Sequence, residues 1–187
     1  MSDPAGFALA GCDIKTSADG EFSFGIARAS AQDTWTRTYA LAPGGRLELI
    51  NVNGRIDAEP ASGNSLELVA TRTAKGSDDE VAKANLAKVE MREEVSDARV
   101  RVEVRAPRFS GMSGHEVKWT LKVPKGVHVD LRTVNGSVHV NGLDGEVRAQ
   151  STNGGVRGRA VASPLVNAST VNGGIDSVYS RTGKVAP

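Results

Sequence analysis

The sequence predicts a mostly β protein in which a short repeat winds into stacked coils, a β-solenoid. Asn-Gly pairs recur at Asn135-Gly136, Asn153-Gly154 and Asn172-Gly173, so the period is 153 − 135 = 18 and then 172 − 153 = 19. Aromatic residues make up only 4% of the chain and Gly accounts for 21 residues, which suits thin sheets with tight corners better than a helical bundle. A repeat of this kind places like residues above one another in successive coils.

The residues around each Asn fall into columns with the parity of a β-strand, in which successive side chains face opposite sides. The inward columns are Val129, Val147 and Val166; Leu131, Ala149 and Ala168; Thr133, Ser151 and Thr170; and Val138, Val156 and Ile175. The outward residues, which we expect in water, are His128, Asp130, Arg132, Arg148, Gln150, Arg157 and Asp176. The inward face is therefore small and apolar, with one column of hydroxyl groups.

A fourth copy lies earlier in the chain, with its corner at Asn53-Gly54 and with Leu47, Leu49 and Ile56 in the same columns. A long interval, from Asn53 to Asn135, separates its corner from the next one. Within that interval the patterns predict a strand over 65–73, a short helix over 77–90, a hairpin over 89–104 and a strand with Trp119 over 116–123. Ser77 is the expected helix cap, with Glu80 three positions on.

We therefore divide the chain into an N-terminal segment, 1–32, and a single β-repeat domain, 33–187. In that domain, 33–126 holds the N-terminal strands, the helix and the hairpin, and 127–187 holds the regular coils. The N-terminal segment contains Leu9-Ala10-Gly11-Cys12, which resembles a bacterial lipobox, although no Lys or Arg precedes Cys12. Two interpretations stay open: Cys12 carries a lipid, with 13–32 as a flexible tether, or it is an ordinary thiol near a frayed terminus.

The charge balance gives no sign of a nucleic-acid partner. Lys and Arg number 23 against 22 Asp and Glu, a formal net charge of +1, whereas nucleic-acid binding calls for a basic face. The sequence also lacks a run of about 20 apolar residues, so we expect membrane contact only through a lipid anchor. With one cysteine, the chain can form no internal disulfide.

Each Asn-Gly corner has a structural explanation. Gly adopts positive φ freely and Asn tolerates it, and the asparagines of successive coils can hydrogen-bond one another. The inward hydroxyl column needs partners too, because an unpaired buried polar group costs about 1–3 kcal/mol. On the corner argument we expect Gly154→Val to lower stability by more than about 1 kcal/mol.

The end of the repeat array looks incomplete. Val185 follows Asn172 at the same spacing as Val166 follows Asn153, so a further coil has barely begun. Either the natural chain continues beyond Pro187, or the last strand closes the stack. An uncapped coil would offer an open sheet edge for self-association or for addition of a partner strand.

One pattern supports a family resemblance. The motif T-V-N-G-x-V-x-V-x-G-L-x-G-x-V-x-A-x-T-x-N-G over 133–154, preceded by L-K-V-P-K-G-V-H-V over 121–129, resembles the putative-adhesin, β-strand-repeat family of bacterial domains of unknown function. The resemblance covers roughly 33–185. It implies a right-handed β-solenoid in an envelope-associated protein with a role in adhesion, and it brings no catalytic residues with it.

No residue set commits to a reaction or a cofactor. His128 and His139 share an outward parity, yet a metal site needs a third donor that the spacing does not supply. Outward carboxylates could serve a polysaccharide lyase or glycosidase, namely Asp130, Asp144, Glu146 and Asp176. They are scattered among basic residues, as on any solvated face. Trp35, Tyr39 and Trp119 are expected in the core.

The sequence therefore predicts a non-enzymatic interaction module of the bacterial cell envelope or exterior, which binds a surface polysaccharide or protein. Two alternatives remain. One is an enzyme acting on extracellular polysaccharide through a pair of carboxylates. The other is a structural stalk or scaffold.

Overall fold

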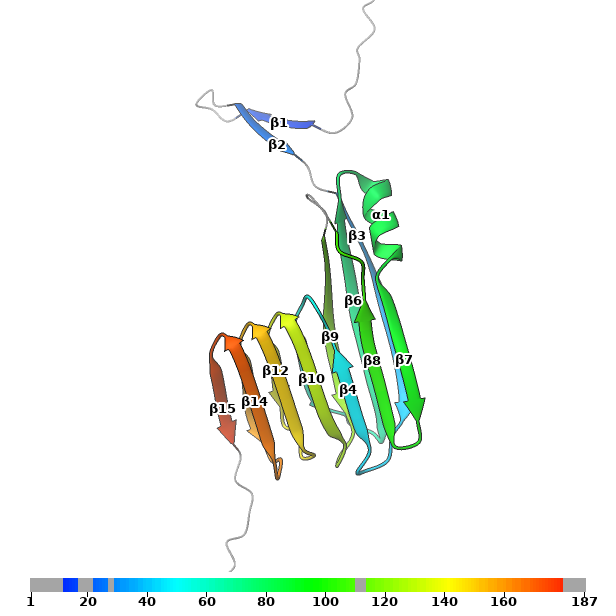
Figure 1. The fold of residues 1–187 in the computed structure, drawn as a ribbon, viewed down its shortest axis with the longest axis vertical. Coiled ribbons are helices and arrows are strands. Elements are labelled where there is room, and N and C mark those ends of the chain that lie inside the picture. Colours follow the sequence, from blue (N-terminus) through cyan, green and yellow to red (C-terminus); the bar gives the residue numbers. More distant parts are fainter. Residues whose placement is uncertain (1–11, 17–21, 27–28, 110–113, 180–187) are drawn as a thin grey trace, which may run out of the picture.

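Two β-sheets packed against each other make up most of the protein (Figure 1). The structure is a computed structural model that describes residues 12–16, 22–26, 29–109 and 114–179. The six-stranded sheet contains, in spatial order, β14 (Val166–Asn172), β12 (Val147–Asn153), β10 (His128–Asn135), β4 (Arg46–Ile50), β8 (Arg99–Arg105) and β7 (Glu90–Ser96). The seven-stranded sheet contains β15 (Ile175–Tyr179), β13 (Val156–Val161), β11 (Val138–Asn141), β5 (Ile56–Pro60), β9 (Gly114–Val123), β6 (Ser65–Gly76) and β3 (Ala29–Ala40).

Each repeat gives one strand to each sheet, and neighbouring repeats pair in parallel. The register is the one that the columns predict: Val129 lies opposite Val147, which lies opposite Val166, and Asn135, Asn153 and Asn172 align likewise. The early copy joins the same stack, with Leu47 opposite Val129 and Asn53 bridged to Asn135. Repeats that are far apart in the sequence are therefore direct neighbours in space.

The interval between these two copies builds the other end of the stack. Strands β8 and β9 pair in parallel with β4 and β5, so they form a further coil that lacks an Asn-Gly corner. Beyond them β7 pairs with β8, and β6 with β9 and β3, all antiparallel. Both sheets are thus mixed and neither closes on itself. The structure confirms a mostly β fold with one short helix, and the right-handed β-solenoid remains a prediction.

The helix α1 (Asp79–Ala87) is shorter than the predicted 77–90, and its cap is not Ser77. Asp78 takes the cap position, where its carboxylate accepts a hydrogen bond of 2.8 Å from the Val81 amide. That bond lowers the pKa of Asp78. The helix stops before Val89 because that side chain is drawn into the core and β7 begins at Glu90.

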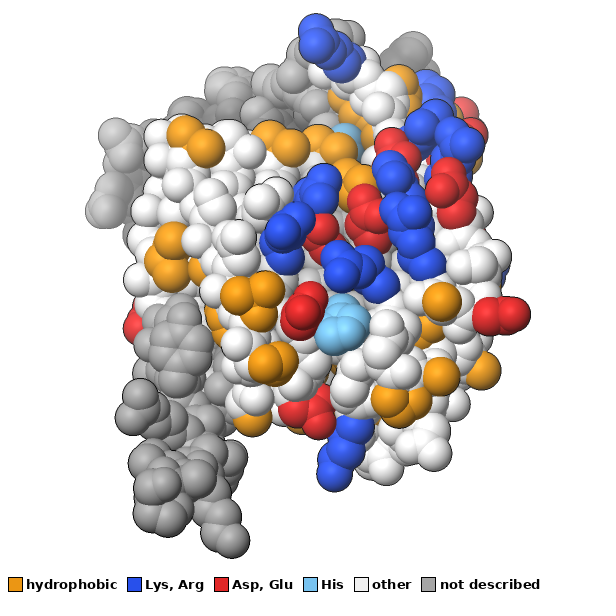
Figure 2. Space-filling view, turned by 60° about the horizontal axis from the view of Figure 1, so that its bottom comes forward, with side chains coloured by type: hydrophobic (Ala, Val, Ile, Leu, Met, Phe, Trp, Pro, Cys, Tyr) orange, Lys and Arg blue, Asp and Glu red, His pale blue; other side chains and the backbone are white. Residues whose placement is uncertain are grey.

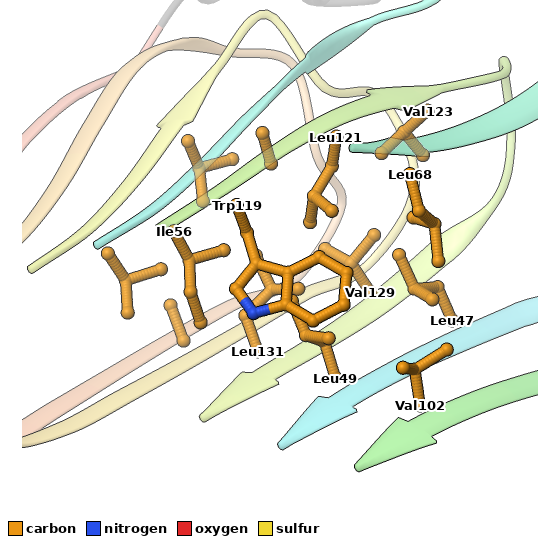
Figure 3. Close-up of a cluster of buried hydrophobic side chains, with 14 of the residues drawn as sticks. Leu47, Leu49, Ile56, Leu68, Val102, Trp119, Leu121, Val123, Val129 and Leu131 are labelled. Atoms are coloured by element: carbon orange, nitrogen blue, oxygen red, sulfur yellow. The ribbon is translucent and has the colours of Figure 1, made fainter. Parts of the chain in front are cut away.

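The core lies between the two sheets and is centred on Trp119 (Figure 3). Leu47, Leu49 and Leu131 meet it from the six-stranded sheet, and Ile56 comes from the seven-stranded sheet. Trp119 is buried, as predicted, whereas Trp35 and Tyr39 are partly buried against the core. The stack narrows toward its last repeat, since Leu49 and Leu131 are followed in their column by Ala149 and Ala168.

The stretch interpreted from sequence as a tether contains regular structure. Strands β1 (Cys12–Thr16) and β2 (Phe22–Ile26) form an antiparallel hairpin, and β3 begins at Ala29 rather than at Asp33. Pairing with β6 explains the earlier start, because Ala29 lies opposite Gly76 at the far end of that long strand. The lipobox-like residues before Cys12, and Val185, lie outside the described residues. The described part contains no helix with the length and apolar character needed to span a bilayer.

Candidate functional site

The asparagines of the four repeats form a hydrogen-bonded ladder along one side of the stack. Asn135 Nδ2 donates to Asn53 Oδ1 at 2.7 Å, Asn153 Nδ2 to Asn135 Oδ1 at 2.8 Å, and Asn172 Nδ2 to Asn153 Oδ1 at 2.8 Å. Asn135, Asn153 and Asn172 are the last residues of their strands, so the ladder fixes the register where each chain turns toward the other sheet. This role is structural.

The glycines of the corners are required mainly by close approach. A Cβ atom on Gly136 would lie 2.2 Å from the carbonyl oxygen of Gly54, and one on Gly154 would lie 2.1 Å from that of Gly136. The same holds for Gly173, at 2.2 Å from the Gly154 oxygen. Gly54, Gly136 and Gly154 have positive φ, but Gly173 does not. The sequence therefore identified the right glycines, but positive φ is only part of the reason that glycine is needed there.

The inward hydroxyl groups of Thr133, Ser151 and Thr170 are hydrogen-bonded, as predicted for buried polar groups. Thr133 Oγ1 donates to the Gly54 carbonyl at 3.2 Å, Ser151 Oγ to that of Gly136 at 2.8 Å, and Thr170 Oγ1 to that of Gly154 at 2.8 Å. In the first repeat the same column holds Asn51, whose Nδ2 donates to the Val117 carbonyl at 3.0 Å. The column therefore continues to β9.

Charged side chains gather on the outer face of the six-stranded sheet, over strands β8, β4, β10 and β12. We call this surface the arginine face. Its arginines are Arg46, Arg99, Arg101, Arg105, Arg132 and Arg148, and its acids are Glu48, Glu103, Asp130 and Glu146, so the local balance is 6 − 4 = +2. Figure 2 shows basic side chains gathered around acidic ones on one side of the molecule.

Two carboxylates lie at the bottom of the arginine face. Asp130 and Glu48 are opposite each other on the paired strands β10 and β4, and their side chains are only 6% and 11% exposed. The expectation that Asp130 faces water is therefore wrong. It does point away from the core, but the side chains of the neighbouring strands cover it. Glu48 was not singled out from sequence, although it occupies the same repeat position, five before the Asn (135 − 130 = 5 and 53 − 48 = 5).

Each buried carboxylate is held by arginines. Arg132 donates two hydrogen bonds to Asp130, from Nε to Oδ1 at 2.9 Å and from Nη2 to Oδ2 at 2.7 Å. Arg148 approaches the same carboxylate at 4.0 Å, and Glu48 pairs with Arg99 and, at 3.6 Å, with Arg101. The hydrogen bond to Asp130 raises the pKa of Arg132, and that to Glu48 raises the pKa of Arg99. The guanidiniums stay charged.

The other candidate carboxylates do not join this pair. Asp144 accepts a hydrogen bond of 2.9 Å from the Gly126 amide and so serves a turn. Asp176 lies on β15, in the other sheet. Glu146 lies at the rim of the arginine face, 3.8 Å from Arg46. The four acids considered from sequence therefore do not form one catalytic group.

The histidines do not meet either. His128 lies on β10 in the six-stranded sheet, where its Nδ1 accepts a hydrogen bond of 3.0 Å from the Glu146 amide. His139 lies on β11 in the other sheet, 3.2 Å from an Asp57 oxygen. The two histidines share an outward position in the repeat, but they do not lie on the same surface, because consecutive strands of one repeat belong to different sheets. Across the described residues, no three His, Cys, Asp or Glu side chains are grouped to hold a metal ion.

A hollow of about 400 Å³ lies beside the start of the asparagine ladder. Its walls include Asn53, Asn135, Lys75 and His115. Burial lowers the pKa of His115, and its Nε2 has no hydrogen-bond partner among the described atoms. Cys12 opens strand β1, and attachment of a lipid to it stays a prediction.

The pairing at Asp130 leads to a first stability prediction. Arg132→Ala should lower the free energy of unfolding by about 1–3 kcal/mol, because it removes both hydrogen bonds from a nearly buried carboxylate. Arg148→Ala is the matched control on the next strand. It should cost less than about 1 kcal/mol, since that side chain is half exposed and 4.0 Å from the carboxylate. Urea denaturation of both variants would measure the difference, and equal losses would contradict this account of Asp130.

Comparisons with known proteins leave the family open. No protein-family model and no curated protein matches the chain. Among solved structures, a "putative cell adhesion protein" from Clostridium sporogenes aligns at 11% identity and a TM-score of 0.47, covering 79% of this chain and 100% of that one. A "putative adhesin" from Bacteroides fragilis aligns at 10% identity and a TM-score of 0.28, covering 78% and 97%. Likenesses at this level do not establish a shared function, and the β-strand-repeat family remains a resemblance.

Proposed function

We propose that this chain is a non-enzymatic interaction module of the bacterial cell envelope, and that it binds an anionic surface polysaccharide on the arginine face. The envelope location, the lipid anchor at Cys12 and the solenoid character of the repeats rest on the sequence. The binding surface rests on the geometry of the six-stranded sheet.

The observation that carries the proposal is the depth of the two central acids, Asp130 and Glu48, relative to the arginines that pair with them. The side chains of Asp130 and Glu48 are 6% and 11% exposed, whereas those of Arg132, Arg148 and Arg99 are 41%, 49% and 50% exposed. A ligand that approaches the centre of the arginine face therefore meets these guanidiniums before it meets Asp130 or Glu48. The acids beneath fix the arginines in place, which lowers the entropy cost of using them for binding.

The spacing of these arginines suits a polymer better than a small ligand. Neighbouring strands lie about 4.8 Å apart, so arginines on β12, β10, β4 and β8 form an array across the sheet. A guanidinium binds a carboxylate or sulfate with two parallel hydrogen bonds. A chain of acidic sugars can satisfy several of them in succession, and the many weak contacts then add up.

The cleaving-enzyme alternative has one observation in its favour, the adjacent pair of Asp130 and Glu48. Glycosidases use two carboxylates, one of which must hand a proton to the leaving oxygen. Here both carboxylates are ion-paired and nearly covered by arginines, so neither is placed for that transfer. The binding role agrees better with this arrangement.

The proposal can be tested by measuring retention on immobilised polyuronate, sulfated glycan and neutral glucan. The Arg46→Gln/Arg148→Gln variant should lose affinity for the acidic polymers about tenfold, since two exposed ion pairs contribute up to about 1 kcal/mol each. The matched control is Arg157→Gln/Arg159→Gln, which removes the same charge from exposed positions on β13 of the other sheet. That control should bind like the unchanged protein.

Several outcomes would overturn the proposal. They are equal losses in the two double variants, equal retention on neutral glucan, and binding to duplex DNA as tight as to the acidic glycans. Binding should weaken as salt rises, as for any exposed charge contact. The same samples are assayed for new reducing ends, and their release would establish the enzyme alternative instead.

A further inference from the structure

The hydrogen bonds at successive Asn-Gly corners follow one pattern, in which the same groups donate and accept each time. At each Asn-Gly corner two side chains of the later repeat donate to the earlier one: the Asn side chain donates to the earlier Asn side chain, and the Ser or Thr hydroxyl donates to the earlier Gly carbonyl. At the same corner the Gly amide of the earlier repeat donates to the later Asn carbonyl, as from Gly136 to Asn153 and from Gly154 to Asn172, both at 3.0 Å. The junction between Asn53 and Asn135 repeats all three contacts.

The last repeat presents on its outer side the groups that an earlier repeat uses at a junction. By position, Asn172 offers Oδ1, and Gly173 offers its carbonyl oxygen and its amide. In the part of the chain that the structure describes, β14 and β15 are the edge strands of their sheets, so no later repeat meets these groups there (Figure 1). Asn172 already uses its Nδ2 on Asn153, so among the described residues its oxygen is the end of the ladder.

The apolar core opens at the same place. In the column of Val138, Val156 and Ile175, the exposed fraction rises from 0% to 3% and then to 50%. Val166 and Ala168 are only partly buried, while their equivalents in the preceding repeats are buried. The end of the stack is therefore an interrupted interior, with both hydrogen-bonding groups and apolar side chains that a further coil would cover.

The shape of the end also restricts what can lie on it. At the three junctions between repeats, a Cβ on the incoming corner glycine would lie 2.1–2.2 Å from the preceding glycine's carbonyl oxygen. The residue placed above Gly173 must then be glycine as well. Together the four requirements specify a parallel strand of the sequence Ser/Thr-x-Asn-Gly.

We propose that this end of the stack binds a β-strand of another β-repeat chain, added in parallel to β14 and carrying Ser/Thr-x-Asn-Gly. The strand continues the asparagine ladder at Asn172, its hydroxyl donates to the Gly173 carbonyl, and its asparagine carbonyl accepts from the Gly173 amide. Its apolar residues cover Val166, Ala168 and Ile175. This is strand addition in which the side-chain ladder sets the register.

Among the described residues no strand of this kind is free. Residues 180–187 contain no asparagine. An intact second copy has its corner at Asn53 already covered, since Asn51 donates to the Val117 carbonyl and a Cβ on Gly54 would lie 2.2 Å from that oxygen. Its other three corners lie within the stack or at the same accepting end. A second folded copy therefore does not fit this end, and the strand that we propose comes from a different chain with an exposed repeat.

The test uses a labelled peptide with the sequence of residues 147–161, which carries Ser151, Asn153 and Gly154. Fluorescence anisotropy with the full chain should show saturable binding of this peptide. Peptides with Asn153→Ala or Gly154→Ala, and a scrambled peptide of equal charge, should bind at least tenfold more weakly. Equal binding of the native and scrambled peptides, or no binding of the native peptide, would overturn the proposal.

The protein side gives a second, independent readout. Asn172→Ala removes the accepting oxygen, and Asn167→Ala is its matched control at an exposed position on the same strand. Only the first should lower affinity, again at least tenfold, while melting curves report whether β14 stays folded. Failure of polysaccharide retention would leave this result untouched, because the arginine face and the stack end are different surfaces. Self-association that excludes the peptide would contradict the choice of partner.

Discussion

Gly154→Val is expected to lower the free energy of unfolding by about 3 kcal/mol or more, the upper range for forcing atoms into packed structure. The corner glycines stack so closely that a Cβ at position 154 would lie 2.1 Å from the Gly136 carbonyl oxygen and 2.6 Å from its carbon. Both obstacles are backbone, so no side chain can rotate away. The residue also has φ of 154°, a conformation that valine rarely adopts.

Urea denaturation followed by circular dichroism would measure this loss. Gly174→Val is the control, at the second corner glycine of the next repeat, because a Cβ at Gly174 meets nothing within 4 Å and the residue is exposed. It should change stability by about 0.5 kcal/mol at most. If both substitutions cost the same, the close stacking of the glycine column is not what requires glycine at position 154.

The register of the repeats could be predicted from sequence because the same two contacts recur in every copy. A side-chain ladder and a glycine column both demand the same residue at the same place, so Asn135, Asn153 and Asn172 mark the alignment without ambiguity. Side-chain parity then assigned the core correctly for Val129, Leu131 and their equivalents.

The spatial order of the strands could not be predicted in the same way. Strands β8 and β9 form a coil without an Asn-Gly corner, so nothing local marks them as part of the stack. Their place beside β4 and β5 depends on pairing between segments that are distant in the sequence, which sequence patterns do not report.

The candidate site shows the same limit at the level of single residues. Parity correctly placed Asp130 on the outer face, but its burial depends on Glu48, Arg132 and Arg148, which reach it from three strands. The separation of His128 from His139 depends on which sheet each strand enters. Column alignment would have shown Glu48 opposite Asp130, since both occupy the same position of the repeat.

The second large effect is expected at Trp119. Trp119→Ala should lower the free energy of unfolding by about 3–5 kcal/mol, the usual cost of removing a large aromatic side chain from a core. Trp119 is 1% exposed, lies between Ile56 and the small Ala70 in register, and packs edge-to-face on Trp35 with ring centroids 5.7 Å apart. Its neighbours belong to paired strands of both sheets and cannot move together to fill the space.

The matched variants separate the size of the ring from its polar atom. Trp119→Phe should cost clearly less than the alanine substitution, because it keeps much of the volume and removes an indole N–H that has no hydrogen-bond partner among the described atoms. Trp35→Ala should also cost less, since that ring is only partly buried and Arg37 lies over it at 4.9 Å. Thermal melts that place Trp35→Ala below Trp119→Ala would contradict a core centred between the two sheets, because the more exposed ring would then be the one that holds the layers together.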